Sequence, residues 1–302
     1  MKPVIVVENL RKVYGNTVAV DDISFEVADG EIFGLLGPNG TGKTTTVECL
    51  QGLRHPDSGR MQVLGLNTLT EAQALRRRIG SQLQASALPD RMKVWEALDL
   101  FSSLTKNPLD WRVIMEQWGL AEKSKSSFSS LSGGQKQRLF IALALVNNPG
   151  MVFLDEMTTG LDPAARRIAW ELIRDIRDKG TTVILVTHFM DEAEKLCNRV
   201  AIMDKGRIID IDTPQGLIVK HAGEVRITFT SEKAALPWLE KVPHVRSVKR
   251  RGQYLEVEGD GPVLALVANS LVQNGITPTD LRVEQPTLED VFLKLVGISS
   301  ID

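Results

Sequence analysis

Cysteine, long apolar runs and an excess of either charge are all scarce in this chain of 302 residues. Its two cysteines, Cys49 and Cys197, are too few for a disulfide framework and lack the spacing of metal ligands, so we expect both to be buried. The longest apolar run, Leu139 to Val146, is far too short to span a membrane as a helix. The 36 basic residues nearly cancel the 38 acidic ones, which argues against a dedicated nucleic-acid binder.

The remaining composition is that of an ordinary globular protein, with a hydrophobic fraction of 43% and enough length for about two domains. The first residues, Met1-Lys2-Pro3-Val4, lack the apolar region and the small-residue cleavage site of a signal peptide. We therefore expect a cytosolic chain with a substantial core, which can still dock onto a membrane protein.

The pattern of apolar residues divides the chain into two expected domains, 1–222 and 223–302. In the first, short β-rich runs alternate with helical patterns, and the runs 32–36, 151–154 and 181–186 each end in polar residues. Ligands bind at that edge of an open α/β sheet. In the second, the order of expected elements is β-α-β-β-α-β, which predicts a small ferredoxin-like α+β domain.

Several helix boundaries can be predicted from local signals. Asp162 followed by Pro163 indicates a helix start, and Gly180 indicates its stop. The expected apolar face of that helix carries Ile168, Leu172 and Ile176. Thr213-Pro214 begins a short helix, and Thr287 with Asp290 resembles the capping box of a final helix.

Other elements of the second domain follow from composition. A helix is expected within 232–241, a hairpin around Arg251-Gly252, a helix over 262–273 and a strand within 276–283.

A complete phosphate-binding loop follows the run 32–36. The loop fits G-x-x-x-x-G-K-[ST] and stands between an expected strand and an expected helix. Its backbone N–H groups can wrap the β-phosphate of a nucleotide, Lys43 is a point charge for the β- and γ-phosphates, and Thr44 offers a hydroxyl to Mg²⁺. The expected nucleotide-binding residues of the loop are Gly37, Pro38, Asn39, Gly40, Thr41, Gly42, Lys43, Thr44 and Thr45.

Polar residues at the ends of two further strands suit the same nucleotide. Asp155 and Glu156 are adjacent carboxylates, which repel each other unless a cation lies nearby. Asp155 suits Mg²⁺, and Glu156 can polarise an attacking water. His188 follows an apolar strand, where a neutral imidazole can hydrogen-bond the γ-phosphate and that water.

Two further candidates rest on residue type alone. A glutamine can reach a Mg²⁺-bound water without adding charge, and Gln82 and Gln84 both follow or end an expected strand. Tyr14 is one of only two tyrosines and can stack on an adenine ring.

Residues 131–138, L-S-G-G-Q-K-Q-R, form a second glycine-rich turn at the start of a helix. Such a turn also presents backbone N–H groups to an anion, although the phosphate loop already serves one nucleotide.

These motifs, with Gly160-Leu161-Asp162, occur in the order and spacing of an ABC-superfamily ATPase cassette, which the chain resembles over about residues 4–220. The resemblance implies ATP and Mg²⁺ as ligands and ATP hydrolysis to ADP and phosphate as the reaction.

The same resemblance implies a role for each site residue, with Tyr14 as the adenine-stacking residue and Glu156 as the general base. It also selects Gln84 over Gln82, makes His188 the switch histidine, and gives Asp162 to the loop that crosses to the other subunit. The implied catalytic residues are Glu156, His188, Gln84 and Lys43, and the implied metal ligands are Thr44, Gln84 and Asp155.

The resemblance also gives the second turn a ligand. In this family the residues equivalent to Ser132, Gly133, Gly134 and Gln135 contact the ATP bound to another cassette, so two cassettes sandwich two ATP molecules head to tail. The implied partners are a second copy or a paralogous cassette, and a membrane permease on a separate chain, at the cytoplasmic face of the membrane. Met157 stands where the family usually has proline, and we expect it to pack in the same place.

The region after residue 223 resembles the accessory domain of the drug- and polysaccharide-export branch, similar to daunorubicin-resistance ATP-binding subunits. This implies export of drugs, antibiotics or lipid-like compounds rather than uptake. Residues 85–119 are the expected surface for the permease, with Trp95 and Phe101 placed in the core. The alternatives are an ABC ATPase that acts on the ribosome or DNA, and a second domain that serves mainly dimerisation or regulation. The sequence does not identify the transported compound.

Overall fold

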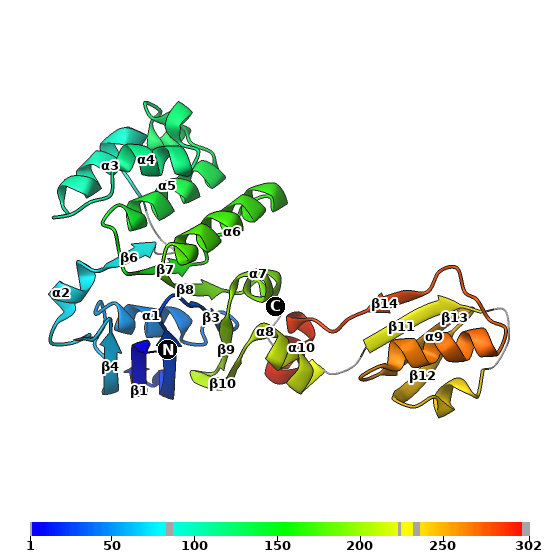
Figure 1. Ribbon diagram of the computed structural model, residues 1–302. Coiled ribbons are helices and arrows are strands. Elements are labelled where there is room, and N and C mark those ends of the chain that lie inside the picture. Colours follow the sequence, from blue (N-terminus) through cyan, green and yellow to red (C-terminus); the bar gives the residue numbers. More distant parts are fainter. Residues whose placement is uncertain (1, 83–86, 223–224, 232–235, 298–302) are drawn as a thin grey trace. The chain divides into compact units, whose positions relative to one another are not determined.

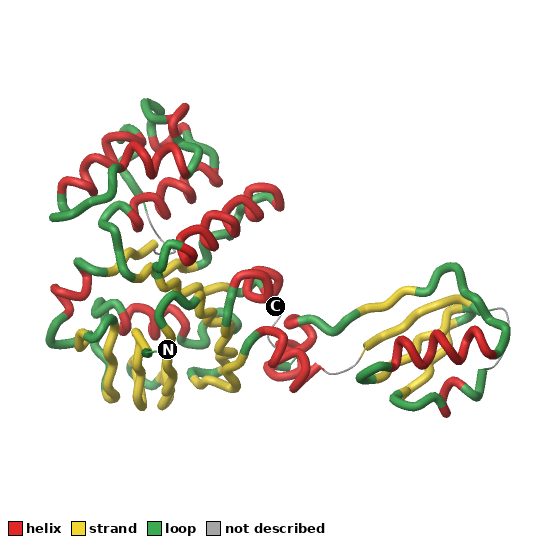
Figure 2. The backbone as a smooth tube through the Cα atoms, in the orientation of Figure 1, coloured by secondary structure: helices red, strands yellow, loops and turns green. Residues whose placement is uncertain are grey.

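The computed structural model describes residues 2–82, 87–222, 225–231 and 236–297. Contacts between Cα atoms divide it into two compact units, Met1–Pro214 and Gln215–Asp302. The expected boundary at residues 222 and 223 lies later in the chain. Figure 1 labels the elements and Figure 2 distinguishes helix, strand and loop.

The first unit contains two sheets. The smaller is antiparallel, in the order β2-β1-β4-β5, with bounds β1 Pro3–Tyr14, β2 Thr17–Ala28, β4 Ser58–Val63 and β5 Leu66–Asn67. The larger has the order β10-β9-β3-β8-β7-β6, and every pair in it is parallel except β10 with β9. Its bounds are β3 Ile32–Leu36, β6 Ile79–Gln82, β7 Met151–Asp155, β8 Thr182–Thr187, β9 Arg199–Asp204 and β10 Arg207–Asp212.

The central strands of the larger sheet are apolar on both faces. Every residue of β3, β7 and β8 is buried, so the prediction of buried parallel strands is confirmed. Helix α1 (Lys43–Leu50) shares one apolar core with both sheets, because Val47 and Leu50 pack with Ile5 of β1 and Phe33 of β3. Both cysteines are buried, as expected.

Helices α3, α4 and α5 pack against one another in a separate layer, green to cyan in Figure 1. The helices of this unit beyond α1 are α2 Ala72–Arg76, α3 Val94–Ser103, α4 Trp111–Gln117, α5 Gly133–Leu145, α6 Pro163–Asp178 and α7 Met190–Leu196, with 3₁₀ turns at Ala121–Lys123 and Phe128–Ser130.

The predicted bounds of α6 are confirmed, but its predicted apolar face is wrong in part. Asp162 caps the helix by accepting hydrogen bonds from the N–H groups of Ala164 and Ala165. Ile168 is 48% exposed, whereas Ala169, Trp170, Ile173 and Ile176 form the buried face. The predicted positions are four residues apart, but an α-helix has 3.6 residues per turn, so successive positions rotate around the helix axis. For this reason Ile176 is buried and Ile168 is not.

The second unit contains a four-stranded antiparallel sheet in the order β12-β13-β11-β14. Its elements are α8 Pro214–Leu217, a π-helical turn Ile218–Ala222, β11 Val225–Thr230, a 3₁₀ turn Leu239–Lys241, β12 Val245–Arg251, β13 Tyr254–Gly259, α9 Val263–Gln273, β14 Arg282–Glu284 and α10 Leu288–Val296. Residues Val263, Val267 and Leu271 of α9 pack on the sheet.

This unit has the expected β-α-β-β-α-β order with one change. The part of 232–241 that the structure describes contains only a 3₁₀ turn, and residues 232–235 lie outside the described residues. The capping box of the last helix is confirmed, because the Thr287 side chain accepts from the Asp290 N–H and the Thr287 N–H donates to Asp290 Oδ2. Helix α10 packs on the π-helical turn, where Lys294 Nζ donates to His221 O at 2.8 Å.

Candidate functional site

The phosphate loop connects β3 to α1 in a conformation that requires glycine. Gly40 and Gly42 have φ angles of +81° and +95°. A Cβ atom at Gly42 would strike the carbonyl oxygen of Ala19, and one at Gly37 would strike that of Met203. Thr41 Oγ1 closes the loop by donating to Pro38 O at 2.9 Å. The sequence therefore builds a tight turn whose backbone can approach a phosphate closely.

Lys43 is the buried cation of this loop. Its side chain is only 5% exposed, and Nζ donates to Gly37 O at 2.7 Å and to Pro38 O at 2.8 Å. Burial lowers the pKa of the ammonium group, while the charges of Glu156 and Asp155 act to raise it. The ammonium group thus lies at the place in the loop where a bound phosphate would need a positive charge.

Asp155 ends β7 beside the start of α1. Its Oδ2 accepts from Thr44 Oγ1 at 3.5 Å, and its buried Oδ1 makes no hydrogen bond. Burial, and then the charge of Glu156, raises the pKa of Asp155 to about 6. A buried carboxylate with one oxygen unsatisfied, next to a hydroxyl, is a donor set that suits Mg²⁺.

Two predicted ligands of this region need separate mention. Gln84 lies outside the described residues, so its position relative to Asp155 stays a prediction. Gln82, the competing glutamine, is buried at the end of β6. Within the described ranges no group of three or more His, Cys, Asp or Glu side chains is placed to hold a metal ion.

Glu156 and His188 meet at the ends of the adjacent strands β7 and β8. His188 Nδ1 lies 3.2 Å from Glu156 Oε1, and the imidazole is 38% exposed. Glu156 has a φ of +49°, and its N–H donates to Val186 O at 2.9 Å. This left-handed backbone conformation is strained for a non-glycine residue. The hydrogen bond to β8 holds the backbone of Glu156, and this positions its side chain. Met157 follows and is fully buried, as expected.

Tyr14 ends β1 in the smaller sheet. Its ring is 39% exposed and has two cations near its faces, with Lys12 Nζ 5.4 Å and the Arg54 guanidinium 5.2 Å from its centroid. An exposed ring can stack on the base of a nucleotide, and basic neighbours suit the negative charge of its phosphates.

The second glycine-rich turn is of a different kind. Ser132 caps α5 in a reciprocal capping box: its N–H donates to Gln135 Oε1 at 2.9 Å, and its Oγ accepts from the Gln135 N–H at 3.3 Å. Ser132 and Gly133 are exposed, and a Cβ at Gly133 would meet no atom within 4 Å. A Cβ at Gly134 would lie 3.5 Å from the side chain of Leu161, which places this turn beside the loop of Asp162.

The aromatic residues of 85–119 divide differently from the expectation. Trp118 is buried, Trp95 is half-buried, and Phe101, predicted to lie in the core, is 38% exposed. The prediction for Phe101 is wrong because its side chain lines a cavity and is not enclosed by the helices of its own layer.

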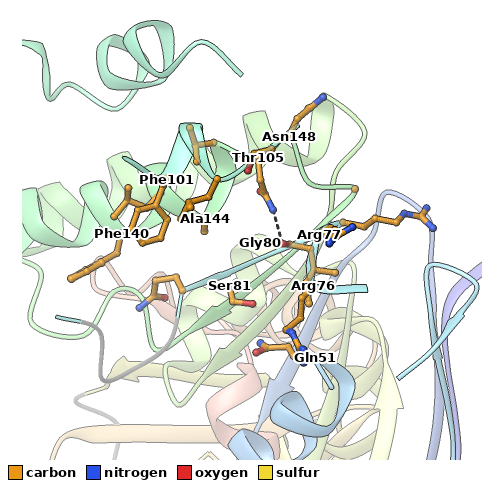
Figure 3. A pocket seen from close by; sticks show the side chains of 18 of the residues that line it. Gln51, Arg76, Arg77, Gly80, Ser81, Phe101, Thr105, Phe140, Ala144 and Asn148 are labelled. Carbon is orange, nitrogen blue, oxygen red and sulfur yellow. Dashed lines mark hydrogen bonds between the residues drawn. The ribbon is translucent and has the colours of Figure 1, made fainter. Parts of the chain in front are cut away.

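That cavity has a volume of about 1080 Å³ and is the feature that sequence reasoning missed. Figure 3 shows it from close by. Its lining comes from five separate stretches: the end of α1, residues 76–82, residues 87–88, residues 101–107 and residues 140–150. The run Arg76-Arg77-Arg78 was the one local signal in the sequence.

In the part of the chain that the structure describes, no helix combines the length and the apolarity needed to cross a membrane.

The chain matches known proteins along nearly its whole length. Residues 20–159 match a family model described as "ABC transporter". The chain is 40% identical to the Nod factor export ATP-binding protein I of Mesorhizobium japonicum over 95% of this chain and 84% of that one. It is 35% identical to the daunorubicin resistance ATP-binding protein DrrA2 of Streptomyces coeruleorubidus, over 96% and 94% of the two chains.

Among solved structures, cbiO1 from Clostridium perfringens, described as part of the ABC transporter complex cbiONQ, is similar with a TM-score of 0.64. It is 27% identical, and the match covers 73% of this chain and 92% of that one. The fold is thus that of an ABC ATPase cassette. The phosphate loop, Asp155, Glu156 and the second glycine turn all lie within residues 20–159, which the family model matches. The chain belongs to the family of ABC transporter ATP-binding proteins, which bind and hydrolyse ATP.

Proposed function

We propose that this chain is the ATP-hydrolysing subunit of an exporter, and that hydrolysis takes place between two cassettes arranged head to tail. The contrast between the two glycine-rich turns supports the proposal best. The first turn encloses Lys43 and faces Asp155, whereas the second is exposed at Ser132 and Gly133 and is already capped. Because Ser132 and Gly133 are exposed, the second turn is open to an anion that another chain presents.

Within one site, each residue has a distinct task. Tyr14 stacks on the adenine, the backbone of 37–45 wraps the phosphates, and Lys43 releases its two carbonyl contacts to meet the β- and γ-phosphates. Glu156 accepts a proton from the attacking water. His188, which already lies 3.2 Å from Glu156, contacts the γ-phosphate and holds that carboxylate in place.

We assign a magnesium ion to Thr44 Oγ1 and the unsatisfied Oδ1 of Asp155, with Gln84 as a third expected ligand. When bound, the ion neutralises charge on the phosphates. Beside such a cation, Asp155 would stay ionised below its pKa of about 6, and its repulsion with Glu156 would be weaker.

Ser132, Gly133, Gly134 and Gln135 then contact the γ-phosphate held by the other cassette, and Asp162 lies in the loop that crosses between them. The partner cassette is a second copy or a paralogue. Helix α5 begins at this turn, so its N-terminus adds a partial positive charge to the anion site.

Export is the transport direction that the relatives support. One is named for Nod factor export and another for daunorubicin resistance, and the two matches cover 95% and 96% of this chain. We propose that the transported compounds are drugs, antibiotics or lipid-like molecules, and that the chain works at the cytoplasmic face of the membrane. Closure of the dimer drives a separately encoded permease, which docks at the cavity between residues 76–82 and 101–107.

A mixing experiment tests the dimer. Lys43→Ala damages the first turn and Ser132→Arg damages the second, and each variant alone should lose ATPase activity. In a head-to-tail dimer of one variant with the other, both lesions fall in one site and the second site is intact. If the sites act independently, an equal mixture should recover about a quarter of the wild-type rate, because half of the dimers are mixed.

The ATPase rate of the mixture at increasing total concentration is the measurement. If Lys43 and Ser132 served the same ATP within one chain, no mixture would exceed the sum of the two variants. Differently tagged chains show whether mixed dimers form. If mixed dimers form and activity is not recovered, the head-to-tail dimer is contradicted.

A further inference from the structure

Three buried polar atoms without hydrogen-bond partners lie around the carboxyl group of Glu192 in α7. They are Thr158 Oγ1, Arg166 Nε and Glu192 Oε2, and none of them is bonded to a residue that the structure describes. Thr158 and Glu192 are both 0% exposed, so bulk water does not reach them either. Unsatisfied buried polar groups are costly, and a group of them in one place requires an explanation.

The Glu192 carboxyl is the centre of this group. Its Oε1 accepts a hydrogen bond from Trp170 Nε1 at 3.1 Å. Burial raises the pKa of the carboxyl, and four neighbouring side chains act to lower it: Thr187, Thr158, Trp170 and Arg166. The Thr158 hydroxyl therefore lies close to the carboxyl, although neither Thr158 Oγ1 nor Glu192 Oε2 is bonded within the described part of the chain.

The segments that meet at Glu192 lead to the residues of the proposed site. Thr158 lies in the turn between Glu156, the proposed general base, and Asp162, which caps α6. Glu192 lies in α7, which begins two residues after His188. Helix α7 packs against both α6 and β8 (Figure 1). One buried carboxyl thus joins the segments of the base, the histidine and the loop proposed to cross between chains.

The turn of Thr158 contains two hydrogen bonds of its own. The N–H of Thr159 donates to Glu156 O at 3.1 Å, and the N–H of Leu161 donates to Thr158 O at 3.2 Å. Both bonds lie inside the turn and do not attach it to α7. A hydrogen bond from Thr158 Oγ1 to the Glu192 carboxyl would add that attachment.

Arg166 is a less suitable partner for the unbonded carboxyl oxygen, because its guanidinium group is already engaged. Its Nη1 lies 3.5 Å from Asp191 Oδ2, and its guanidinium carbon lies 4.4 Å from the centroid of the Phe189 ring. The Phe189 ring in turn lies 4.1 Å from the ring of His188. Movement of Arg166 would break contacts that support the histidine, whereas the Thr158 hydroxyl has no hydrogen bond to a described residue to lose.

We propose that Glu192 is a positioning residue for ATP hydrolysis, and that Thr158 Oγ1 donates a hydrogen bond to Glu192 Oε2 when two cassettes close on ATP. This rests on the proposed function, since the contact forms in the head-to-tail dimer. It fixes the turn 156–162 to the helix that follows His188, so the base and the imidazole are held in one arrangement. In the single chain both atoms stay unpaired, and closure recovers the free energy that this costs.

Thr158→Val in the full-length chain tests the contact, because valine keeps the shape of threonine and removes the hydroxyl. We expect kcat for ATP hydrolysis to fall about tenfold, with KM and the affinity of the monomer for ATP unchanged, because the contact forms only after binding. Thr158→Ser keeps a hydroxyl and should retain most of the wild-type rate. A wild-type kcat in Thr158→Val would overturn the inference.

The chain offers a matched control at Thr68. This threonine is 1% exposed, and its hydroxyl also lacks a hydrogen-bond partner in the described ranges. Thr68 follows β5 and lies outside the turn 156–162. Thr68→Val should therefore hydrolyse ATP at the wild-type rate. A loss as large as that of Thr158→Val would show that the rate responds to any buried hydroxyl, and the assignment to Thr158 would fail.

Thermal unfolding distinguishes positioning from a structural role. Without nucleotide, Thr158→Val should melt at the wild-type temperature or above it, because it removes an unsatisfied buried hydroxyl. In the ATP-bound dimer of Glu156→Gln, the same substitution should lower the melting temperature, because the contact is lost there. A clear decrease without nucleotide would mean that the hydroxyl is already bonded in the single chain, which contradicts the proposal.

Two substitutions of Glu192 identify the acceptor. Glu192→Met removes both oxygens, and in that background Thr158→Val should slow hydrolysis no further, because its partner is already absent. Glu192→Gln keeps groups that can bond the threonine and Trp170, so it should be faster than Glu192→Met. A second tenfold loss on adding Thr158→Val to Glu192→Met would show that the two residues act independently.

The oligomeric state of the same samples separates this inference from the proposed function. A Glu156→Gln chain that dimerises with ATP, together with a wild-type rate in Thr158→Val, contradicts the inference alone. A chain that hydrolyses ATP without dimerising, and that Thr158→Val slows, contradicts the proposed dimer alone.

Discussion

The two glycine-rich turns of this protein each precede a helix but have opposite surroundings. The first lies between a fully buried strand and α1, and glycine is required there by carbonyl groups of Ala19 and Met203. It also contains the buried Lys43, which lies close enough to the carboxylates of Asp155 and Glu156 for their charges to raise its pKa. The second is exposed at Ser132 and Gly133, has open space next to Gly133, and contains the capping box of Ser132 and Gln135.

The difference shows what each turn can do alone. The first carries a cation, a metal-binding hydroxyl and a neighbouring base, so it is equipped to bind and hydrolyse a nucleotide. The second offers N–H groups and a helix N-terminus, which can strengthen binding of an anion but not select a nucleotide. A nucleotide should therefore bind the first turn without the second, and hydrolysis should need both.

The largest effect should come from Glu156→Gln, which removes the proposed general base of the first turn. We expect ATP hydrolysis to fall by about 10²–10⁴-fold, because the amide cannot accept the proton of the attacking water. Nucleotide binding and closure should survive, so the variant should accumulate as an ATP-bound dimer. Phosphate release and light scattering after size exclusion measure the two quantities.

The matched control is Glu171→Gln, at an exposed glutamate of α6. It should hydrolyse ATP at the wild-type rate. A Glu156→Gln chain that stays monomeric at saturating Mg-ATP would contradict the sandwich of two cassettes.

The second effect concerns the second turn. Ser132→Arg should leave the affinity of the monomer for ATP unchanged and lower the hydrolysis rate by about 10²-fold, because a bulky side chain at the turn blocks the nucleotide of the other chain. Equilibrium binding under dilute conditions and steady-state hydrolysis separate the two. Ser103→Arg, on an exposed part of α3, should change neither. A weaker affinity in the monomer would mean that both turns hold the same nucleotide.

Much of the first turn could be predicted from sequence, because its chemistry is local. The strand 32–36, the loop and the residues that end β7 and β8 each follow from a short pattern, and their meeting follows from the parallel order of a sheet. The helix starts at Asp162 and Thr287 were predictable for the same reason, since a cap is a contact between residues three apart.

The features that were missed depend on packing between distant segments. Phe101 is apolar, and nothing in its own helix shows that one side of it faces a cavity. The unsatisfied amide of Gln51 becomes visible only when the end of α1 is placed beside Arg76 and α5. The first helix expected in the second unit failed where Pro237 removes a backbone donor, and a 3₁₀ turn follows it.

The third effect is a pH dependence confined to the first turn. Asp155 has a pKa of about 6 in the fold against an ordinary value of 3.8, so its ionisation destabilises the folded state. That cost is absent below about pH 4 and complete above about pH 6. Without divalent cations, Asp155→Asn should therefore raise the free energy of unfolding by about 1–2 kcal/mol at pH 8 and leave it unchanged near pH 4. Urea unfolding at both pH values is the measurement.

Magnesium gives this prediction its link to function. Mg²⁺ with nucleotide should stabilise the wild-type chain more than Asp155→Asn at pH 8, and should lose that advantage as the pH falls through about 6. Asp178→Asn, at an aspartate on the surface, should show neither effect. A difference between Asp155→Asn and wild type that does not change with pH would indicate a packing effect instead of a carboxylate that titrates.

The smallest effect should come from Tyr14, at the edge of the first turn's site. Loss of the ring in Tyr14→Ala should weaken ATP binding by about three- to tenfold, because stacking of an exposed ring contributes about 1 kcal/mol. Tyr14→Phe keeps the ring between Lys12 and Arg54 and should bind ATP as the wild type does. Calorimetry with ATP and with inorganic triphosphate distinguishes the base from the phosphates: the alanine variant should lose affinity for ATP only. If both ligands bound more weakly, Tyr14 would act by positioning the two cations, and the first turn would owe its selectivity for adenine to other residues.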